Sequence, residues 1–473
     1  MQRNVTLNIL LMSLLLNGLT ACTQSVSEHR LPTINTPAQF SGYAHWHMVS
    51  EPTTATPAWW QAFKDDTLNQ LVETLTINNA TLQASEAQYR AAVATLIGSQ
   101  ASQVPTLSAT ASANNGTIAT SNSFSSSSLP TNSNYALNAS VSWELDLWGR
   151  IRQTVQSNEA KAQASLADLY AARLSSQALL VQSYFQLRNT DLQIDIVNTS
   201  IAAYHRFVRL TQARQQAGVV SSLDVAQAKT QYHTTQAQLL DLQEQRARYQ
   251  HAIATLLGQS ASGFTISKRN EDSALIPALP TLVPSTLLLN RPDIIASERR
   301  VAAANAQIGV AQSAFFPTIN LVGSAGYRNT EISNLVNVPN TIWSLGPSLA
   351  FSLFDGGLRE ANVKIAEAGL DQATATYKQT VLNAFQEVED NLSSIALLHE
   401  EAQVQQQALD AAMQAHRIAQ SQYRAGISSA LNVISAQTAE LSAQRTQKSI
   451  QLRQQLASLV LLKNTGGGLN RQP

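Results

Sequence analysis

The sequence predicts a mainly α-helical fold that is internally duplicated and carries a membrane β-barrel. Three observations lead to this class. Residues 150–217 contain neither proline nor glycine and residues 358–425 contain no proline, so each stretch can form one helix. Such helices are on the order of 100 Å long at ~1.5 Å per residue. A predicted strand with one apolar and one polar face precedes each stretch, and the same short motifs occur twice along the chain in the same order.

The first clear strand pattern occupies residues 135–147 and leads directly into the first long helix. Apolar side chains alternate with polar ones there, and the polar set is Asn138, Ser140, Ser142, Glu144 and Asp146. This period of two is that of a β-strand. From Gly149 onward the alternation is replaced by an Ala-, Gln- and Leu-rich sequence, which predicts a helix over residues 149–216.

The second copy repeats the landmarks of the first. VPTLSATAS at Pro105 recurs as FPTINLVGS at Pro317, and QQAGVVSSLDV around Gly218 recurs as YRAGISSALNV around Gly426. Each copy is therefore predicted to contain a helix, a β-hairpin, a long helix, a tight turn and a return helix. The first copy spans 65–258 with its hairpin at 106–147, and the second spans 287–463 with its hairpin at 318–353 and its long helix at 357–425. A leader (22–64), an equatorial linker (259–286) and a flexible tail (464–473) complete the predicted division.

Composition excludes several classes of protein. Lys plus Arg and Asp plus Glu both number 31, so there is no basic surplus for binding nucleic acid. No run of about 18 apolar residues predicts a transmembrane helix. The single cysteine, Cys22, follows a basic residue, a short apolar run and small residues, which resembles a bacterial lipobox. We expect a signal peptide at 1–21 and acylation of Cys22, for instance with palmitate; the alternative is an ordinary signal peptide with an incidental cysteine.

The predicted strands require an assembly. Four strands per chain, each about 10 residues long, can cross a bilayer but cannot close a barrel. An open edge in lipid leaves backbone amides unpaired at a cost of several kcal/mol each, so we expect a dimer, trimer or tetramer. The polar strand faces, with Ser344, Ser348 and Ser352 in the second copy, would line a wet lumen. The alternative is a soluble β-sandwich with Trp143, Trp343 and Tyr135 in its core, which strands separated by ~65-residue helices fit poorly.

No credible catalytic constellation emerges from the sequence. Glu144 and Asp146 lie on one strand face, as a general acid and base would, but solvated lumen carboxylates are the favoured interpretation. His45 and His47 have a spacing suited to a metal, yet no third ligand is near. We therefore expect no cofactor, no metal site and no enzymatic activity.

Several motifs together resemble one family. They are LLLNRPDIIASERRVAAANAQIGVAQSAFFPTINL (287–321), WWQAFKDDTLNQLV, VSWELDLWGRIR, LFDGGLR and the lipobox. They are similar to the outer-membrane factor family, in its lipoprotein branch that serves tripartite multidrug efflux systems. The resemblance implies a homotrimer with a twelve-stranded β-barrel in the outer membrane of a Gram-negative bacterium, continuing into a twelve-helix periplasmic α-barrel. It also implies a passive exit duct, with a periplasmic adaptor (membrane fusion) protein and an inner-membrane pump as partners.

In that family the helix–turn–helix tips form the periplasmic aperture and contact the adaptor. The matching positions are Gly218, Val219, Ser221, Ser222, Leu223, Asp224, Gly426, Ile427, Ser428, Ser429, Leu431 and Asn432. The alternative is that these residues only build two αα-hairpins, because a glycine stop followed by a serine cap suits any such turn. Asp224 is the only carboxylate in this set, so an acidic ring at the aperture is not expected.

Three other functions stay open at this point: a duct for protein secretion, a purely structural envelope-spanning lipoprotein, and an enzyme. Acylation and the RPDI segment favour efflux of small molecules over protein secretion. Polar strand faces favour conduction over a scaffold.

Overall fold

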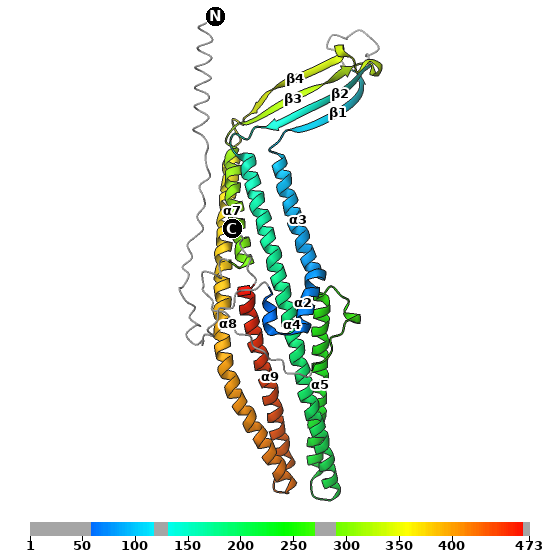
Figure 1. Ribbon diagram of the computed structural model, residues 1–473, viewed down its shortest axis with the longest axis vertical. Helices are drawn as coiled ribbons and strands as arrows, with labels where there is room; N and C mark the ends of the chain where they lie inside the picture. The colour runs from blue at the N-terminus through cyan, green and yellow to red at the C-terminus, as the bar shows by residue number, and fades with distance from the viewer. Residues whose placement is uncertain (1–57, 118–130, 270–289, 467–473) are drawn as a thin grey trace. The chain divides into compact units, whose positions relative to one another are not determined.

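The computed structural model describes residues 58–117, 131–269 and 290–466 (Figure 1). Its main elements are η2 (Trp59–Phe63), α2 (Asp66–Asn78), α3 (Ala80–Ala101), β1 (Thr106–Thr117), β2 (Thr131–Glu144), α4 (Arg150–Gln216), α5 (Ser222–Leu256), η3 (Ala261–Gly263), α7 (Pro292–Ser313), β3 (Thr318–Asn329), η4 (Ile332–Asn334), η5 (Val338–Asn340), β4 (Thr341–Ala350), α8 (Leu358–Arg424) and α9 (Ala430–Gly466). The prediction of a mainly helical chain with one β-hairpin in each copy is confirmed. Within the ranges given above, no helix combines the length and apolarity needed to cross a membrane.

The chain divides into two compact units. Among the residues the structure describes, the first unit contains 88–117, 131–165 and 296–377, which include the whole β-sheet. The second contains 58–87, 166–269, 290–295 and 378–466, which include both helical turns. The long helices α4 and α8, each of 67 residues, belong partly to one unit and partly to the other.

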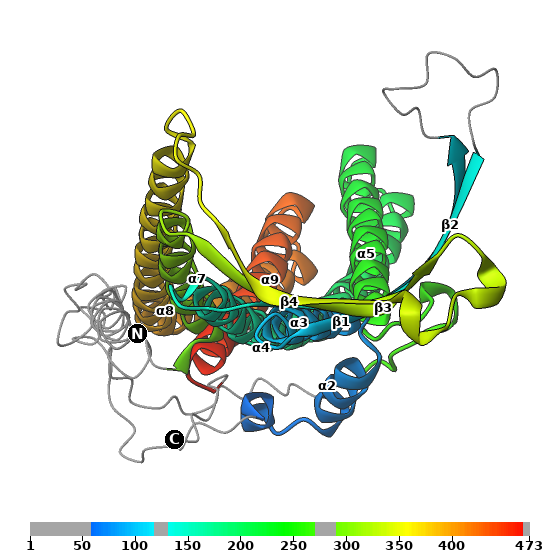
Figure 2. The same cartoon turned by 90° about the horizontal axis from the view of Figure 1, so that it is seen from above.

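The sheet of the first unit is a four-stranded antiparallel meander with strand order β1-β2-β3-β4. Its register keeps like side chains on the same face. Leu107 lies opposite Val141, and Ser108 lies opposite Ser140. Because successive side chains alternate between faces, one face is mostly apolar and the other is rich in Ser, Thr and Asn, as the sequence pattern predicts. Figure 2 shows the sheet from above, with its strands twisted along their length.

The first predicted helix is interrupted, which is a correction to the sequence analysis. One helix is predicted before the hairpin of the first copy, which begins at residue 65, but the structure has two: α2 ends at Asn78 and α3 begins at Ala80. Asn79 adopts an extended backbone, and its side-chain oxygen accepts a hydrogen bond from the Leu82 amide at 3.0 Å. Its Nδ2 donates to the Leu256 carbonyl at 2.7 Å. The break is therefore stabilised by a contact with α5, which the sequence around Asn79 does not predict.

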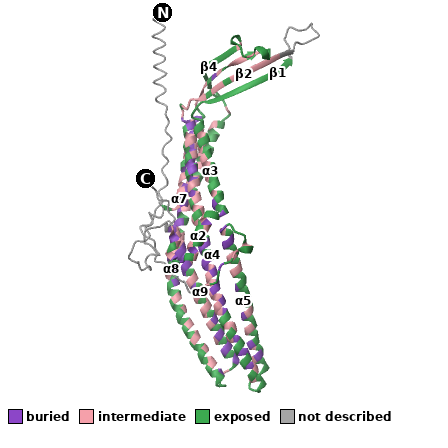
Figure 3. Ribbon diagram, turned by 45° about the vertical axis from the view of Figure 1, so that its right-hand side comes forward, coloured by how far each residue is buried: buried purple, intermediate pink, exposed green. Residues whose placement is uncertain are grey.

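The main hydrophobic core lies in the second unit and is built around α4 (Figure 3). Leu180, Tyr184 and Leu187 of this helix are fully buried. Phe63 from η2 packs edge-on against Phe185, with ring centroids 4.8 Å apart. The aromatic segment that precedes α2 therefore packs against the middle of α4. Burying each such side chain is worth about 1.5–3 kcal/mol.

Candidate functional site

The two helical turns have the same backbone construction. Gly218 and Gly426 adopt left-handed φ angles of 75° and 80°. In the first turn the amide of Val219 donates to the Arg214 carbonyl at 2.9 Å, and in the second the amide of Ile427 donates to the Gln422 carbonyl at 3.0 Å. These bonds define a Schellman motif at the end of each long helix, which favours glycine because it has no Cβ.

The return helices begin differently in the two copies. Ser221 caps α5, and Asp224 completes a capping box by accepting from the Ser221 amide at 3.0 Å and from the Ser221 hydroxyl at 2.8 Å. In the second copy Asn432 donates from its side chain to the Ser428 hydroxyl at 3.1 Å. The Asp224 carboxylate at the first turn is therefore bound to Ser221. At the second turn, Ser428 and Asn432 carry no charge.

Apolar side chains protrude from both turns. Val219 and Leu223 are 67% and 63% exposed, and their counterparts Ile427 and Leu431 are 76% and 52% exposed. Ser222 and Ser429 are exposed beside them. Exposed aliphatic groups at matching positions of two turns are a feature of protein-binding surfaces. We call the set Val219, Leu223, Ile427 and Leu431 the tip quartet.

One functional candidate was missed by the sequence analysis. Arg214, near the end of α4, donates from its guanidinium to the carbonyl of Tyr423 at 2.7 Å and to that of Arg424 at 2.9 Å. These carbonyls belong to the last turn of α8, where backbone carbonyls lack their usual partner four residues later, although the Tyr423 carbonyl also accepts from the Gly426 amide at 3.1 Å. A basic residue in the last turn of a helix normally stabilises the end of its own helix. The sequence therefore gives no indication that Arg214 binds Tyr423, which lies 209 positions later in the chain.

A small core lies directly above the turns. Tyr423 is buried at 2% exposure and packs on Phe207, with ring centroids 5.2 Å apart. Ala430 and Val433 of α9 and Ala228 of α5 complete the cluster with Phe207 and Tyr423. All four helices that meet the turns contribute to it, so displacing one turn disturbs the packing of the other.

Two further contacts link helices of this region. His416 of α8 and Glu440 of α9 are joined by a hydrogen bond of 2.5 Å. The Tyr204 hydroxyl of α4 lies 3.3 Å from that of Thr438 in α9. Burial raises the pKa of Tyr204, so its phenol is neutral at physiological pH.

The predicted lumen residues lie on the polar face of the sheet in the first unit. The Ser108 and Ser140 hydroxyls are 3.2 Å apart, and those of Ser324 and Ser344 are 2.8 Å apart. Ser140 and Ser324 are paired as well, so one row of serines crosses all four strands. Ser142 and Asn138 continue the polar face beside Ser140, opposite Val322 and Gly326. Ser348 pairs with Asn320, whereas Ser352 lies beyond the end of β4.

Glu144 and Asp146 have partners that differ from the solvation expected of them. Glu144, the last residue of β2, pairs in bidentate fashion with Arg150 at 2.8 and 2.7 Å. Asp146 lies outside the strand and accepts from the amides of Ile151 and Arg152 at 3.0 and 2.9 Å, as a helix cap does. They connect strand to helix, a role in keeping with their position just before α4. Neither carboxylate is arranged as a member of an acid–base pair.

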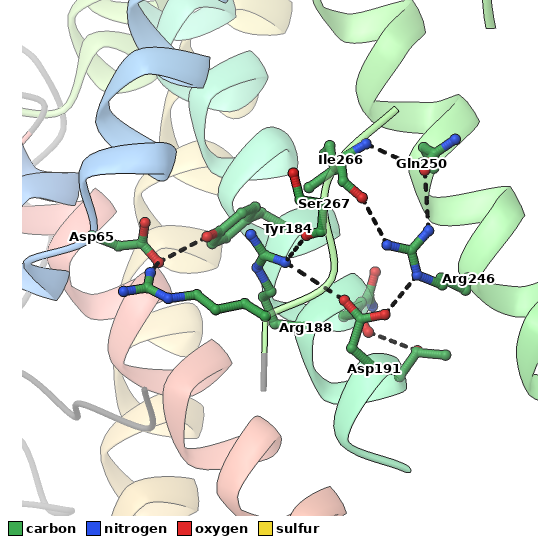
Figure 4. Close-up of polar contacts among 11 residues, drawn as sticks. Asp65, Tyr184, Arg188, Asp191, Arg246, Gln250, Ile266 and Ser267 are labelled. Carbon is green, nitrogen blue, oxygen red and sulfur yellow. Dashed lines mark hydrogen bonds and ion pairs between the residues drawn. The ribbon is translucent and has the colours of Figure 1, made fainter. Parts of the chain in front are cut away.

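A second group of buried charges lies around α4 and α5 (Figure 4). Asp191, whose side chain is 1% exposed, is 2.6 Å from Arg246 and 3.5 Å from Arg188. The two arginines donate to the carbonyls of Ile266 and Ser267 at 2.8 and 2.7 Å. This group fixes the start of the equatorial linker against two helices.

Asp65 extends this set of contacts towards α2. Its carboxylate accepts from the Tyr184 hydroxyl at 2.8 Å and lies 3.4 Å from Arg269, while it also caps α2. Burial is the main reason that the pKa of Tyr184 is raised. The arrangement ties α2, α4 and the linker together, and every charge has an opposite partner.

Metal-ligand clusters of three or more His, Cys, Asp or Glu side chains are absent from residues 58–117, 131–269 and 290–466. Cys22, His45 and His47 lie outside these ranges.

Comparison with known proteins gives consistent matches. The family model described as outer membrane efflux protein matches residues 71–259 and 283–467. The chain is 32% identical over 420 residues to the solvent efflux pump outer membrane protein SrpC of Pseudomonas putida, covering 88% of each chain. It is 30% identical over 414 residues to the pyoverdine export outer membrane protein OpmQ of the same species, covering 87% of this chain and 88% of OpmQ.

Two solved structures extend the comparison. The outer-membrane channel OprN matches with a TM-score of 0.87 and 32% identity, over 94% of this chain and 99% of OprN. The outer membrane protein VceC of Vibrio cholerae matches with a TM-score of 0.78 and 28% identity, over 88% of this chain and 100% of VceC.

Proposed function

Because the chain belongs to the outer membrane efflux protein family, we propose that it is the exit duct of a tripartite efflux system. Proteins of this family are outer membrane channels and not enzymes. In the proposed assembly, three copies form one duct, and a periplasmic adaptor couples it to an inner-membrane pump. The pump supplies the energy, since a passive duct needs neither a catalytic group nor a cofactor.

The proposed cargo is a range of small organic molecules. SrpC and OpmQ are named for solvents and for pyoverdine, which differ greatly in polarity. The polar face of this sheet offers them mainly hydroxyl and amide groups, with the serine row at its centre. Such a surface supports passage without strong selection by charge, so the pump sets the specificity.

The tip quartet is the proposed contact with the adaptor. Its four aliphatic side chains are exposed, whereas the residues immediately behind them, such as Val225 and Val433, are buried at 7% and 1%. A surface of this kind binds the apolar side chains of a partner and excludes water from them. Ser222 and Ser429 next to the quartet supply polar groups for the rim of the contact.

We propose that the contact between Arg214 and the end of α8 holds the duct closed, and we call this contact the latch. It joins the end of the first long helix to the end of the second through two charge-assisted hydrogen bonds. Separation of the two turns breaks both bonds and exposes Tyr423. Engagement of an adaptor on the tip quartet supplies the free energy that offsets this loss.

Photocrosslinking in living cells tests the function. A photoreactive residue at Ser429 is expected to capture a periplasmic adaptor, identified by mass spectrometry. The same residue at Ser394, an exposed position in α8 remote in sequence from the turn, is the matched control. Capture of peptidoglycan-associated proteins alone from Ser429 would favour a structural lipoprotein instead.

A further inference from the structure

We propose that the groove between α5 and α9 is a binding site for a small, hydroxyl-rich anion, a sugar acid or a sugar phosphate, whose charged group is held by Arg445. The groove lies wholly within the second unit, and α4, α5 and α9 line it (Figure 1). The inference goes beyond the proposed function, because binding here requires only these three helices of one chain and neither an adaptor nor a pump.

The groove has the size and the lining of a site for a small polar molecule. Its volume is about 450 Å³, within the ~300–1,000 Å³ typical of small-molecule sites. Gln231 and Gln238 of α5 lie two helical turns apart along one wall, which is about 10 Å. Gln193 of α4 and the hydroxyls of Ser442 and Ser449 of α9 add further polar groups. A lining of amides and hydroxyls selects a ligand that is itself rich in hydroxyl groups.

Arg445 is the one charged residue among those that line the groove in the described part of the chain. Its Nε and Nη2 donate to Gln193 Oε1 at 3.4 and 3.3 Å, longer than the roughly 2.7–3.2 Å of ordinary N–H···O hydrogen bonds. Within the described ranges its Nη1 donates to no atom and no carboxylate forms an ion pair with it. The guanidinium therefore keeps most of its donors for a ligand.

Two other arginines of the second unit have the kind of partner that Arg445 lacks. Arg246 lies 2.6 Å from the Asp191 carboxylate. Arg453, on the same helix as Arg445, lies 3.0 Å from Glu401 although its side chain is 55% exposed. Arg445 is half-buried and so has given up part of its hydration without gaining an anion. A carboxylate or a phosphate has the planar pair of oxygens, or the several oxygens, that a guanidinium binds in bidentate fashion.

Gln238 supplies the complementary polar group on the opposite helix. Its Oε1 is buried and accepts no hydrogen bond from any described residue. A buried amide oxygen without a donor costs free energy, so a donor that enters the groove is stabilised beside it. A ligand hydroxyl is such a donor. The unpaired donors of Arg445 and the unpaired acceptor of Gln238 together match a molecule that carries both an anionic group and hydroxyl groups.

A ligand in this groove would link the two return helices, because Gln238 belongs to α5 and Arg445 to α9. Neighbouring side chains join these helices through long hydrogen bonds. Gln231 Nε2 donates to the Tyr204 hydroxyl at 3.4 Å, and that hydroxyl lies 3.3 Å from the hydroxyl of Thr438. A bound anion adds a second link, so saturating ligand is expected to raise the melting temperature of the protein.

Calorimetric titration of the full-length protein in detergent tests the site. The first pair of probes is galacturonate and galactose, which differ only in whether the ring carries a carboxylate or a hydroxymethyl group. The second pair is glucose 6-phosphate and glucose. We expect the anion of at least one pair to bind about tenfold more tightly than its neutral partner, because one hydrogen bond to a charged group is worth about that factor. Arg445→Gln is expected to abolish the preference, and Arg445→Lys to restore part of it.

Two further variants separate ligand binding from structure. Arg453→Gln removes a guanidinium from the same helix, outside the groove, and should leave every affinity unchanged. Gln238→Met removes the unpaired acceptor at nearly constant volume, so it should weaken the binding of charged and neutral sugars alike. Without ligand it should also raise the melting temperature, because a buried unpaired amide is lost.

The outcomes decide the site independently of the duct. A preference for the anion that depends on Arg445 and not on Arg453 supports the proposal. Equal affinities within both pairs, no binding of either anion, or an equal loss in Arg453→Gln overturns it and leaves the proposed function standing.

Native mass spectrometry of the protein purified from its own envelope identifies the source of the ligand. An anionic adduct that is present in the wild type and absent from Arg445→Gln comes from the envelope. A protein that purifies without an adduct and takes up galacturonate or glucose 6-phosphate binds solutes that are free in the periplasm.

Discussion

The guanidinium of Arg214 contacts Tyr423 in two ways, through a 2.7 Å hydrogen bond to its carbonyl and by lying 4.5 Å from the centroid of its ring. One side chain of α4 therefore holds both the backbone and the aromatic group at the end of α8. Tyr423 is itself buried against Phe207, so this single arginine connects the exposed turns to the core above them.

Replacing Arg214 by alanine is expected to favour the open turns. Hydrogen bonds to charged groups contribute about 1.5–3 kcal/mol each, and a net loss of even ~1.4 kcal/mol raises the open fraction about tenfold. Single-channel recordings in planar bilayers should show a higher open probability. Arg424→Ala removes an exposed guanidinium from the same turn while keeping the carbonyl that Arg214 binds, so it should leave the recordings unchanged. Equal effects of the two variants would mean that charge, and not the latch, matters.

Replacing Asp191 by asparagine is expected to destabilise the second unit strongly. The change leaves Arg188 and Arg246 without their shared buried carboxylate, and such a loss costs about 3–5 kcal/mol. Denaturant unfolding followed by circular dichroism measures the difference in free energy. Asp195→Asn, one turn further along α4 and partly exposed, is the control and should cost less than ~1 kcal/mol. A near-wild-type Asp191→Asn protein would refute the structural importance of this group.

Sequence reasoning succeeded where the signal is local. The left-handed glycines Gly218 and Gly426 and the cap at Ser221 follow from the chemistry of helix ends, and the two faces of the sheet follow from strict alternation. It failed where a residue far away in the sequence determines the local structure or the contact. Asn79 interrupts a helix through a bond to Leu256, and Arg214 binds a helix 209 residues later. Asp146 reads as a strand residue in the alternation, yet its carboxylate caps α4.

Replacing Gly326 by alanine is expected to disturb the sheet. A Cβ at this position would lie 2.2 Å from the Leu137 carbonyl oxygen and 2.8 Å from Cα of Asn138, and backbone atoms cannot yield easily. Overpacking of this kind costs about 1–3 kcal/mol. Gly346→Ala, in β4 of the same sheet, meets nothing within 4 Å and serves as the control. Thermal denaturation in detergent should show a lower melting temperature for Gly326→Ala only; the same temperature for both variants would contradict the tight contact between β2 and β3.

Alkaline pH is expected to destabilise the protein through Tyr184 and Tyr204. Burial is the main cause that raises the pKa of both phenols in the folded chain. A group whose folded pKa is raised contributes stability that is fully present below its unfolded pKa of about 10 and is lost as pH rises through the folded pKa. Melting temperatures should therefore fall above about pH 10, and the fall should be smaller in Tyr184→Phe/Tyr204→Phe. Tyr170→Phe, at an exposed site on α4, should keep the wild-type pH dependence. If the double variant loses stability with pH as steeply as the wild type, other groups control the alkaline transition.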